Sequence, residues 1–152
     1  MAYVGGQEAP AEGCFLCTAA AGEDDERSLV VDRGELTVTL LNRFPYSSGH
    51  LMVVPKRHAP DLLALTEAEG TALFGATRRA VRAITAVLHP DGFNIGVNQG
   101  DAAGASVEHV HQHVVPRWRG DTNFMPVLDD VKVLPEHIES TRTSLRAAFA
   151  AL

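Results

Sequence analysis

The sequence has few features that would cross-link the fold through disulfides or insert it into a membrane. Its 152 residues include only two cysteines, which argues against a disulfide framework in the reducing compartment that we expect. No apolar run approaches the roughly 20 residues that a membrane-spanning helix needs. Residues 1–13 lack the basic and apolar regions of a signal peptide, so we expect a cytoplasmic protein that does not contact membranes.

Positive charge is also scarce in this sequence. Lys and Arg number 13 against 19 Asp and Glu, which gives a net charge of −6. A protein of that sign is a poor general binder of nucleic acid, so any phosphate must be held by local geometry. The length and the hydrophobic fraction of 45% fit one globular domain. We place that domain at 14–152, after a flexible tail over 1–13.

Hydrophobic periodicity predicts two main helices and about five strands. Thr66 and Glu69 form a capping box, and apolar residues at helical spacing behind it predict a helix over 67–88. A second apolar stripe predicts a last helix that begins near Pro135 and ends near Phe149. Because several strands follow one another around one helix, we expect an α+β fold with an antiparallel sheet. The other segments are predicted to be strands over 29–31, 36–41, 50–55, 93–98 and 109–115, and an acidic surface loop over 18–28.

The most informative motif is a row of three histidines in a β-prone run. His109, His111 and His113 occupy alternate positions, so on a strand all three point to one face of the sheet. A three-histidine metal site is one interpretation, but the outer Cα atoms would lie ~13.6 Å apart, which is too far for all three rings to converge. A second interpretation makes His111 a nucleophile that attacks phosphorus and leaves again. A buried histidine cluster without chemistry is the third.

Two further motifs accompany the row. The segment 98–106 is rich in small residues, so it can present backbone N–H groups to a phosphate. Cys14 and Cys17 stand at the spacing of zinc ligands, and His58 and His109 are candidates to complete a closed Cys2His2 site. Such a site would fix the first histidine of the row without performing chemistry. Redox chemistry of the thioredoxin type would need a β-α-β context, which the sequence does not indicate.

Taken together, these motifs resemble the histidine triad (HIT) superfamily. The run 109–115 matches the signature H-φ-H-φ-H-φ-φ apart from Gln112 at an apolar position, and the resemblance extends from Cys14 to about Phe149. It implies a HIT-like fold whose sheet is extended in a homodimer, and a nucleotide hydrolase or nucleotidyl transferase. The stretch 116–127 resembles bacterial proteins related to diadenosine tetraphosphate phosphorylases and to the fragile histidine triad hydrolases.

The resemblance also implies a role for each candidate residue. His111 would attack the α-phosphate of an adenine nucleotide, such as a diadenosine polyphosphate, and form a covalent nucleotidyl intermediate. His113 would contact the phosphate, and His50 would support the site. The remaining implied roles are a base pocket wall of Leu40 and Met52, a ribose contact at Asn42, phosphate contacts at Asn98, Gly104, Ser106 and Val107, a base stack or exit wall at Trp118, and structural Zn²⁺ on Cys14, Cys17, His58 and His109.

Three alternative functions stay open at this point. The chain could be a regulatory module that binds nucleotide and turns it over only incidentally. It could be an adenosine phosphoramidase, although it lacks the C-terminal Trp-Pro-Pro-Gly of that branch. It could also be a metalloenzyme with catalytic zinc on the histidine row. Within the leading interpretation, the sequence does not distinguish water from phosphate as the acceptor.

Overall fold

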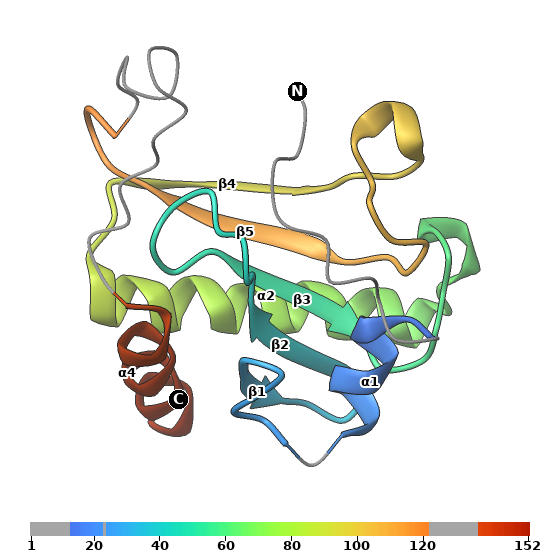
Figure 1. Ribbon diagram of the computed structural model, residues 1–152, viewed down its shortest axis with the longest axis horizontal. Coiled ribbons are helices and arrows are strands. Elements are labelled where there is room, and N and C mark those ends of the chain that lie inside the picture. Colours follow the sequence, from blue (N-terminus) through green and yellow to red (C-terminus); the bar gives the residue numbers. More distant parts are fainter. Residues whose placement is uncertain (1–12, 23, 122–136) are drawn as a thin grey trace.

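One antiparallel sheet organises the chain (Figure 1). The computed structural model describes residues 13–22, 24–121 and 137–152. The sheet order is β1-β2-β3-β5-β4, and every neighbouring pair is antiparallel. This confirms the predicted α+β class and the five-stranded antiparallel sheet. The strands are β1 (Val30–Arg33), β2 (Thr37–Leu41), β3 (Leu51–Pro55), β4 (Gly92–Val97) and β5 (Gln112–Arg117).

The long helix α2 (Glu67–Leu88) has the limits that its apolar period predicts. Its capping box is confirmed, because the Thr66 hydroxyl accepts from the Glu69 N–H at 3.2 Å and the Glu69 carboxylate accepts from the Thr66 N–H at 2.8 Å. Helix α4 (Ile138–Ala150) is the predicted last helix, but Pro135 lies outside the described residues. No helix in the described part of the chain is long and apolar enough to cross a bilayer. The cytoplasmic location stays a prediction.

Helix α1 (Phe15–Ala21) corrects the prediction of a surface loop over 18–28, since the chain is helical as far as Ala21. Arg33 on β1 stabilises the end of this helix by donating hydrogen bonds to carbonyl oxygens of its last turn, including that of Ala20 at 2.9 Å. A helix of seven residues is too short to display a clear apolar period, and the acidic residues behind it hid the signal. Its buried residues are Leu16, Ala19 and Ala20.

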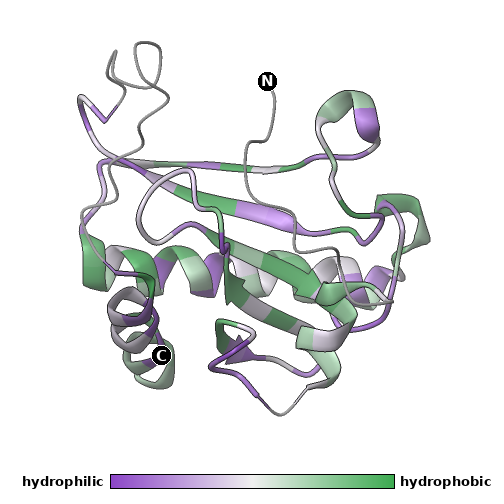
Figure 2. Cartoon of the chain, viewed as in Figure 1, coloured by the Kyte–Doolittle hydropathy of each residue, from purple (hydrophilic) through white to green (hydrophobic). Residues whose placement is uncertain are grey.

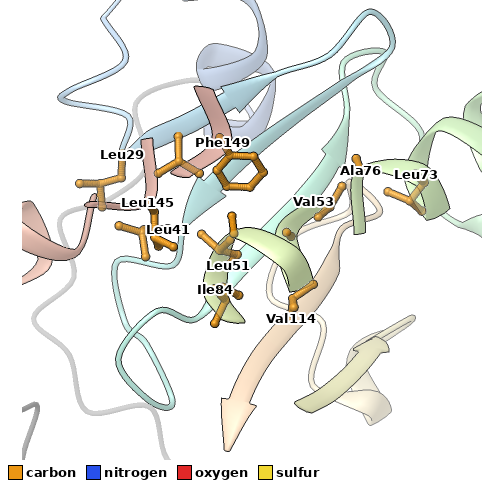
Figure 3. Close-up of a cluster of buried hydrophobic side chains, with 13 residues drawn as sticks. Leu29, Leu41, Leu51, Val53, Leu73, Ala76, Ile84, Val114, Leu145 and Phe149 are labelled. Atoms are coloured by element: carbon orange, nitrogen blue, oxygen red, sulfur yellow. The ribbon is translucent and has the colours of Figure 1, made fainter. Parts of the chain in front are cut away.

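The two faces of the sheet bury different clusters. α2 and α4 cover one face, where side chains from both helices meet those of the central strands (Figure 3). Leu51 and Val114 come from the sheet, whereas Ile84 comes from α2 and Leu145 from α4. The other face packs against α1 around Leu40, Met52 and their neighbours. Figure 2 shows that β2 and β3 are mostly hydrophobic, whereas the beginning of β5 is hydrophilic.

The strand that carries the histidines begins later than predicted. β5 starts at Gln112, where its pairing with β3 also ends, and not at His109. The chain leaves the ladder before that point because the Val110 N–H donates to the carbonyl of Ala59, at 2.7 Å, instead of to a strand. Only His113 of the three histidines lies on the strand. The prediction that all three lie on one strand is wrong for the first two.

Candidate active site and metal cluster

The three histidines of the row divide between two sites. His109 is completely buried and contacts the ring of His58, with ring centres 4.8 Å apart. His111 and His113 contact each other edge to face, with ring centres 4.9 Å apart. His50, just before β3, contacts His113 in turn. The row is therefore divided. His109 joins Cys14, Cys17 and His58 in what we call the metal-type cluster, whereas His111 and His113 form a separate histidine group with His50.

A backbone carbonyl sets the tautomer of His111. Nδ1 of His111 lies 2.7 Å from the carbonyl oxygen of His109. A carbonyl oxygen only accepts, so Nδ1 must carry the hydrogen. In the neutral ring Nε2 then keeps its lone pair. This lone pair is what the predicted attack on phosphorus would use, and the same carbonyl would stabilise the positive charge that develops on the ring.

A chain of hydrogen bonds sets the tautomer of His113. The Tyr46 N–H donates to Nδ1 of His50 at 3.1 Å, so Nε2 of His50 carries the hydrogen. That Nε2–H donates to Nδ1 of His113 at 2.9 Å. His113 is left with its hydrogen on Nε2, as a donor. Burial, and secondarily the nearby charge of His111, lower the pKa of His113 to about 4, so it stays neutral at neutral pH.

His113 also lines a cleft of about 520 Å³ on the side of β4 and β5. Asn98 lies on the same wall, and its contact with a phosphate stays a prediction. His111 is 6% exposed and does not belong to the lining of this cleft. The cleft thus presents His113 to a ligand, and His111 adjoins it. The other lining residues include Tyr46, Ser47, Asn94, Gly96, Arg117 and Asp121.

The residues predicted to contact base and ribose lie beside this group. Leu40 pairs with Met52, and Met52 pairs with His113, so the three share a row across one face of the sheet. Leu40 and Met52 are 3% and 5% exposed in the cluster under α1. The Asn42 side chain accepts from the Phe44 N–H at 2.9 Å. Their contacts with a nucleotide stay predictions.

The small-residue loop before the histidines comes close to Asn98. Gly104 adopts φ +83°, and a Cβ at this position would lie 3.8 Å from the Asn98 amide nitrogen. Ser106 is exposed and Val107 is half-buried. This arrangement is compatible with a phosphate-binding loop, whose role stays a prediction. Trp118 does not belong to the lining of the 520 Å³ cleft. Residues 122–127, the rest of the stretch 116–127, lie outside the described residues.

Cys14, Cys17, His58 and His109 converge as the sequence predicts. One ligand atom from each lies within 4.8 Å of all the others. Nδ1 of His109 is 3.4 Å from both sulfurs, and Nδ1 of His58 is 3.3 Å from the Cys17 sulfur. A tetrahedral zinc with bonds of about 2.3 Å to sulfur and about 2.05 Å to nitrogen needs ligand separations of about 3.5 Å. The donor set therefore fits a zinc ion.

The electronic state of this cluster also suits a metal. Nε2 of His109 lies 2.9 Å from the Pro55 carbonyl, so it carries the hydrogen and leaves the Nδ1 lone pair facing the sulfurs. Burial and the neighbouring Cys14 raise the pKa of the Cys17 thiol. A divalent cation would allow both sulfurs to be thiolates. Because His111 and His113 are outside the cluster, the geometry does not favour catalytic zinc on the row.

Sequence reasoning missed residues that position both sites. Tyr46 stacks on His50, with ring centres 4.8 Å apart and planes at 25°. Its signal was an aromatic residue in a loop four positions before a histidine. Arg57 donates to both carboxylate oxygens of Glu69, at 2.8 and 2.7 Å, and ties the segment of His58 to the start of α2. These bonds lower the pKa of Glu69 to about 2.

Comparison with known proteins agrees with this arrangement. Residues 23–120 match the HIT domain family. The AP-4-A phosphorylase of Mycobacterium tuberculosis is 47% identical over 127 residues, which cover 83% of this chain and 65% of that protein. The asymmetrical bis(5'-nucleosyl)-tetraphosphatase of Schizosaccharomyces pombe is 38% identical over 94 residues, covering 62% of this chain and 52% of that protein. A zinc-bound histidine triad family protein of Mycobacterium smegmatis superimposes with a TM-score of 0.75 at 31% identity, covering 91% and 94% of the two chains.

The chain belongs to the HIT domain family. The family match spans most of the chain and includes all five strands, α2 and the three histidines. The family membership that the histidine row indicated is thereby confirmed. The chain spans slightly less than two thirds of the length of the mycobacterial phosphorylase that it matches.

Burial of His113 next to His111 predicts an unusual titration of this ring. The folded protein should hold His113 neutral, with hydrogen on Nε2, down to a pH of about 4. The unfolded chain takes up that proton from about pH 6.5. This group therefore lowers the stability of the fold as the pH falls from 6.5 towards 4.

Nitrogen-15 NMR of the histidine rings measures both the tautomer and the midpoint. A midpoint of His113 near 6.5 in the folded protein would contradict the effect of burial on its pKa, and hydrogen on its Nδ1 would contradict the direction of the hydrogen bond from His50.

Proposed function

We propose that this protein is an enzyme that cleaves dinucleoside polyphosphates at an α-phosphate through a nucleotidyl intermediate on His111. The observation that carries the proposal is the Nδ1–H bond of His111 to the His109 carbonyl, at 2.7 Å, which leaves Nε2 as the nucleophile. The identity with an AP-4-A phosphorylase and with a bis(5'-nucleosyl)-tetraphosphatase supports the substrate class.

The chemistry takes two displacements at phosphorus. Nε2 of His111 attacks the α-phosphorus, and a P–N bond forms while the P–O bond to the leaving polyphosphate breaks. The leaving oxygen keeps the electron pair. The neutral His113 donates its Nε2–H to a phosphate oxygen, which disperses negative charge in the transition state. An acceptor oxygen then attacks phosphorus, the P–N bond breaks, and the lone pair returns to His111.

The acceptor decides between hydrolysis and phosphorolysis. Water yields a nucleoside monophosphate and releases its proton to the solvent, whereas inorganic phosphate yields a nucleoside diphosphate. The one relative is named a phosphorylase and the other a tetraphosphatase, so both outcomes belong to the proposal. A nucleotide-binding module without turnover, and an adenosine phosphoramidase, are the alternatives.

His111→Asn should lower kcat on diadenosine tetraphosphate by at least about 10³-fold, because it removes the attacking nitrogen and keeps a side chain of similar polarity. Product analysis by mass spectrometry, with and without added phosphate, measures the turnover and identifies the acceptor. His89→Asn is the matched control, since His89 is exposed at the end of α2 in a left-handed conformation that asparagine tolerates. Equal turnover by His111→Asn and the wild type would refute the nucleophile.

We also propose that the four-residue cluster holds a structural zinc ion. Cys14, Cys17, His58 and His109 would supply the ligands. The ion would cross-link α1 to the segments that follow β3 and precede β5. No chemical step passes through it. The zinc-bound relative from Mycobacterium smegmatis supports this assignment.

Cys17→Ser should lose bound zinc and lower the melting temperature before it lowers kcat, because the ion stabilises the fold and not the transition state. Metal analysis, thermal unfolding and turnover at low temperature measure the three quantities. His111→Asn is the control that should retain zinc, since its ring lies outside the cluster. If a chelator abolished turnover while the melting temperature stayed the same, the structural assignment would fail.

We further propose that a homodimer forms through strand β4. β4 is an edge of the sheet, and its six residues, GFNIGV, include no charged residue and no proline. Edge strands without such protective residues pair readily with another chain. A second copy would continue the sheet across the edge, as the resemblance implies.

Ile95, which is 46% exposed on this edge, offers a direct test. Ile95→Lys should convert the dimer to a monomer, because it would place a charged side chain on the edge strand that pairs with the second copy. Sedimentation velocity should show twice the chain mass for the wild type and the chain mass for the variant. A monomeric wild type at micromolar concentration would exclude the dimer.

A further inference from the structure

The cleft that His113 lines lies where the leaving part of the proposed substrate would bind. We propose that this cleft is the subsite of the leaving group, and that it takes an aromatic nucleoside stacked on Tyr46 and not a bare phosphate chain. The inference rests on the proposed function and deepens it. It makes the protein selective for substrates with a nucleoside at each end.

The predicted base pocket and the cleft lie on opposite sides of His113. His113 pairs with Met52 on one side and with Gly96 on the other. The predicted base pocket at Leu40 and Met52 lies towards β2, whereas the cleft extends over β4 and β5. A polyphosphate at His113 that has one nucleoside towards Met52 therefore directs its other end into the cleft. A volume of about 520 Å³ lies in the range of pockets that bury a ligand of that size.

Tyr46 has the placement of a stacking platform. It is 52% exposed and lines the cleft. Its ring stacks on His50 at 4.8 Å between centres, and lies 6.2 Å from the ring of His113. Support from an imidazole holds the aromatic ring near the reacting phosphate at little further cost in side-chain entropy. Nucleobases stack on such rings irrespective of their identity.

The charges of the cleft favour a neutral occupant. Arg117 is the cationic side chain of the described wall, and Asp121 accepts from its Nε and Nη2 at 2.6 and 2.7 Å. Its Nη1 donates to the Asn94 side chain at 2.6 Å. The guanidinium is thus compensated by a carboxylate within the wall, and the amides of Asn94 and Asn98 add neutral polar groups. A ribose and a base suit this surface better than a chain of phosphates.

The test compares two non-hydrolysable probes by titration calorimetry. One is a methylene-bridged diadenosine tetraphosphate, and the other is the methylene-bridged analogue of adenosine 5'-tetraphosphate, which has the same number of phosphates and lacks the second nucleoside. The wild type should bind the first about tenfold more tightly, as one base stack provides. Tyr46→Ala should abolish this ratio. Tyr46→Leu, which keeps an apolar side chain over His50, should abolish it too, whereas Tyr46→Phe should preserve it.

Phe44→Ala is the matched control, because Phe44 is 60% exposed in the same loop and does not line the cleft. It should preserve the ratio. Equal affinities of the wild type for both probes, or a ratio unchanged in Tyr46→Ala and Tyr46→Leu, would overturn the subsite. Failure of the proposed function has a different signature, which is a tenfold ratio in binding without any turnover of diadenosine tetraphosphate.

Discussion

The backbone carbonyl of His109 is the point on which the candidate active site depends. Its oxygen accepts from Nδ1 of His111, while the ring of the same residue turns the other way and faces two cysteine sulfurs. Residue 109 therefore joins the histidine group to the metal-type cluster through its own backbone. Any displacement of the ring would move the carbonyl, and with it the hydrogen bond that keeps the lone pair of His111 on Nε2. The proposed nucleophile and the proposed metal site thus depend on one residue.

The sequence predicts best the features that are long or local. Helix α2 has the predicted limits because 22 residues give a clear apolar period and the capping box marks its start. Helix α1, with seven residues, was missed because its burial comes from tertiary packing on β2 and β3. The late start of β5 has the same origin, since the Val110 N–H bonds to Ala59 in a distant segment. Local β propensity does not depend on such a long-range bond, so it could not predict the late start of the strand.

In the candidate site, too, local features were predicted from the sequence and contacts between distant residues were not. Cysteine spacing pointed to Cys14 and Cys17, His58 and His109 were candidates to join them, and the family resemblance implied the full set, which the structure brings together. The bond between His50 and His113 joins residues 63 positions apart, and only the family resemblance indicated that His50 matters. Tyr46 had no such indication, because an exposed loop aromatic has no periodic neighbour. Its relation to His50 becomes visible only when the loop is folded back over the sheet.

Charge compensation limits how strongly the candidate site would attract the polyanionic substrate that we propose. The net charge of −6 gives no general attraction to phosphate, and His113 is held neutral by burial. Arg117 is compensated by Asp121. Under the proposed function, binding energy would come from directed N–H donors at the phosphates and from the uncharged nucleosides. Such a site would gain little from a substrate that offers more phosphate, and much from one that offers a second aromatic base. The weak field of the site would then itself be a source of the proposed selectivity.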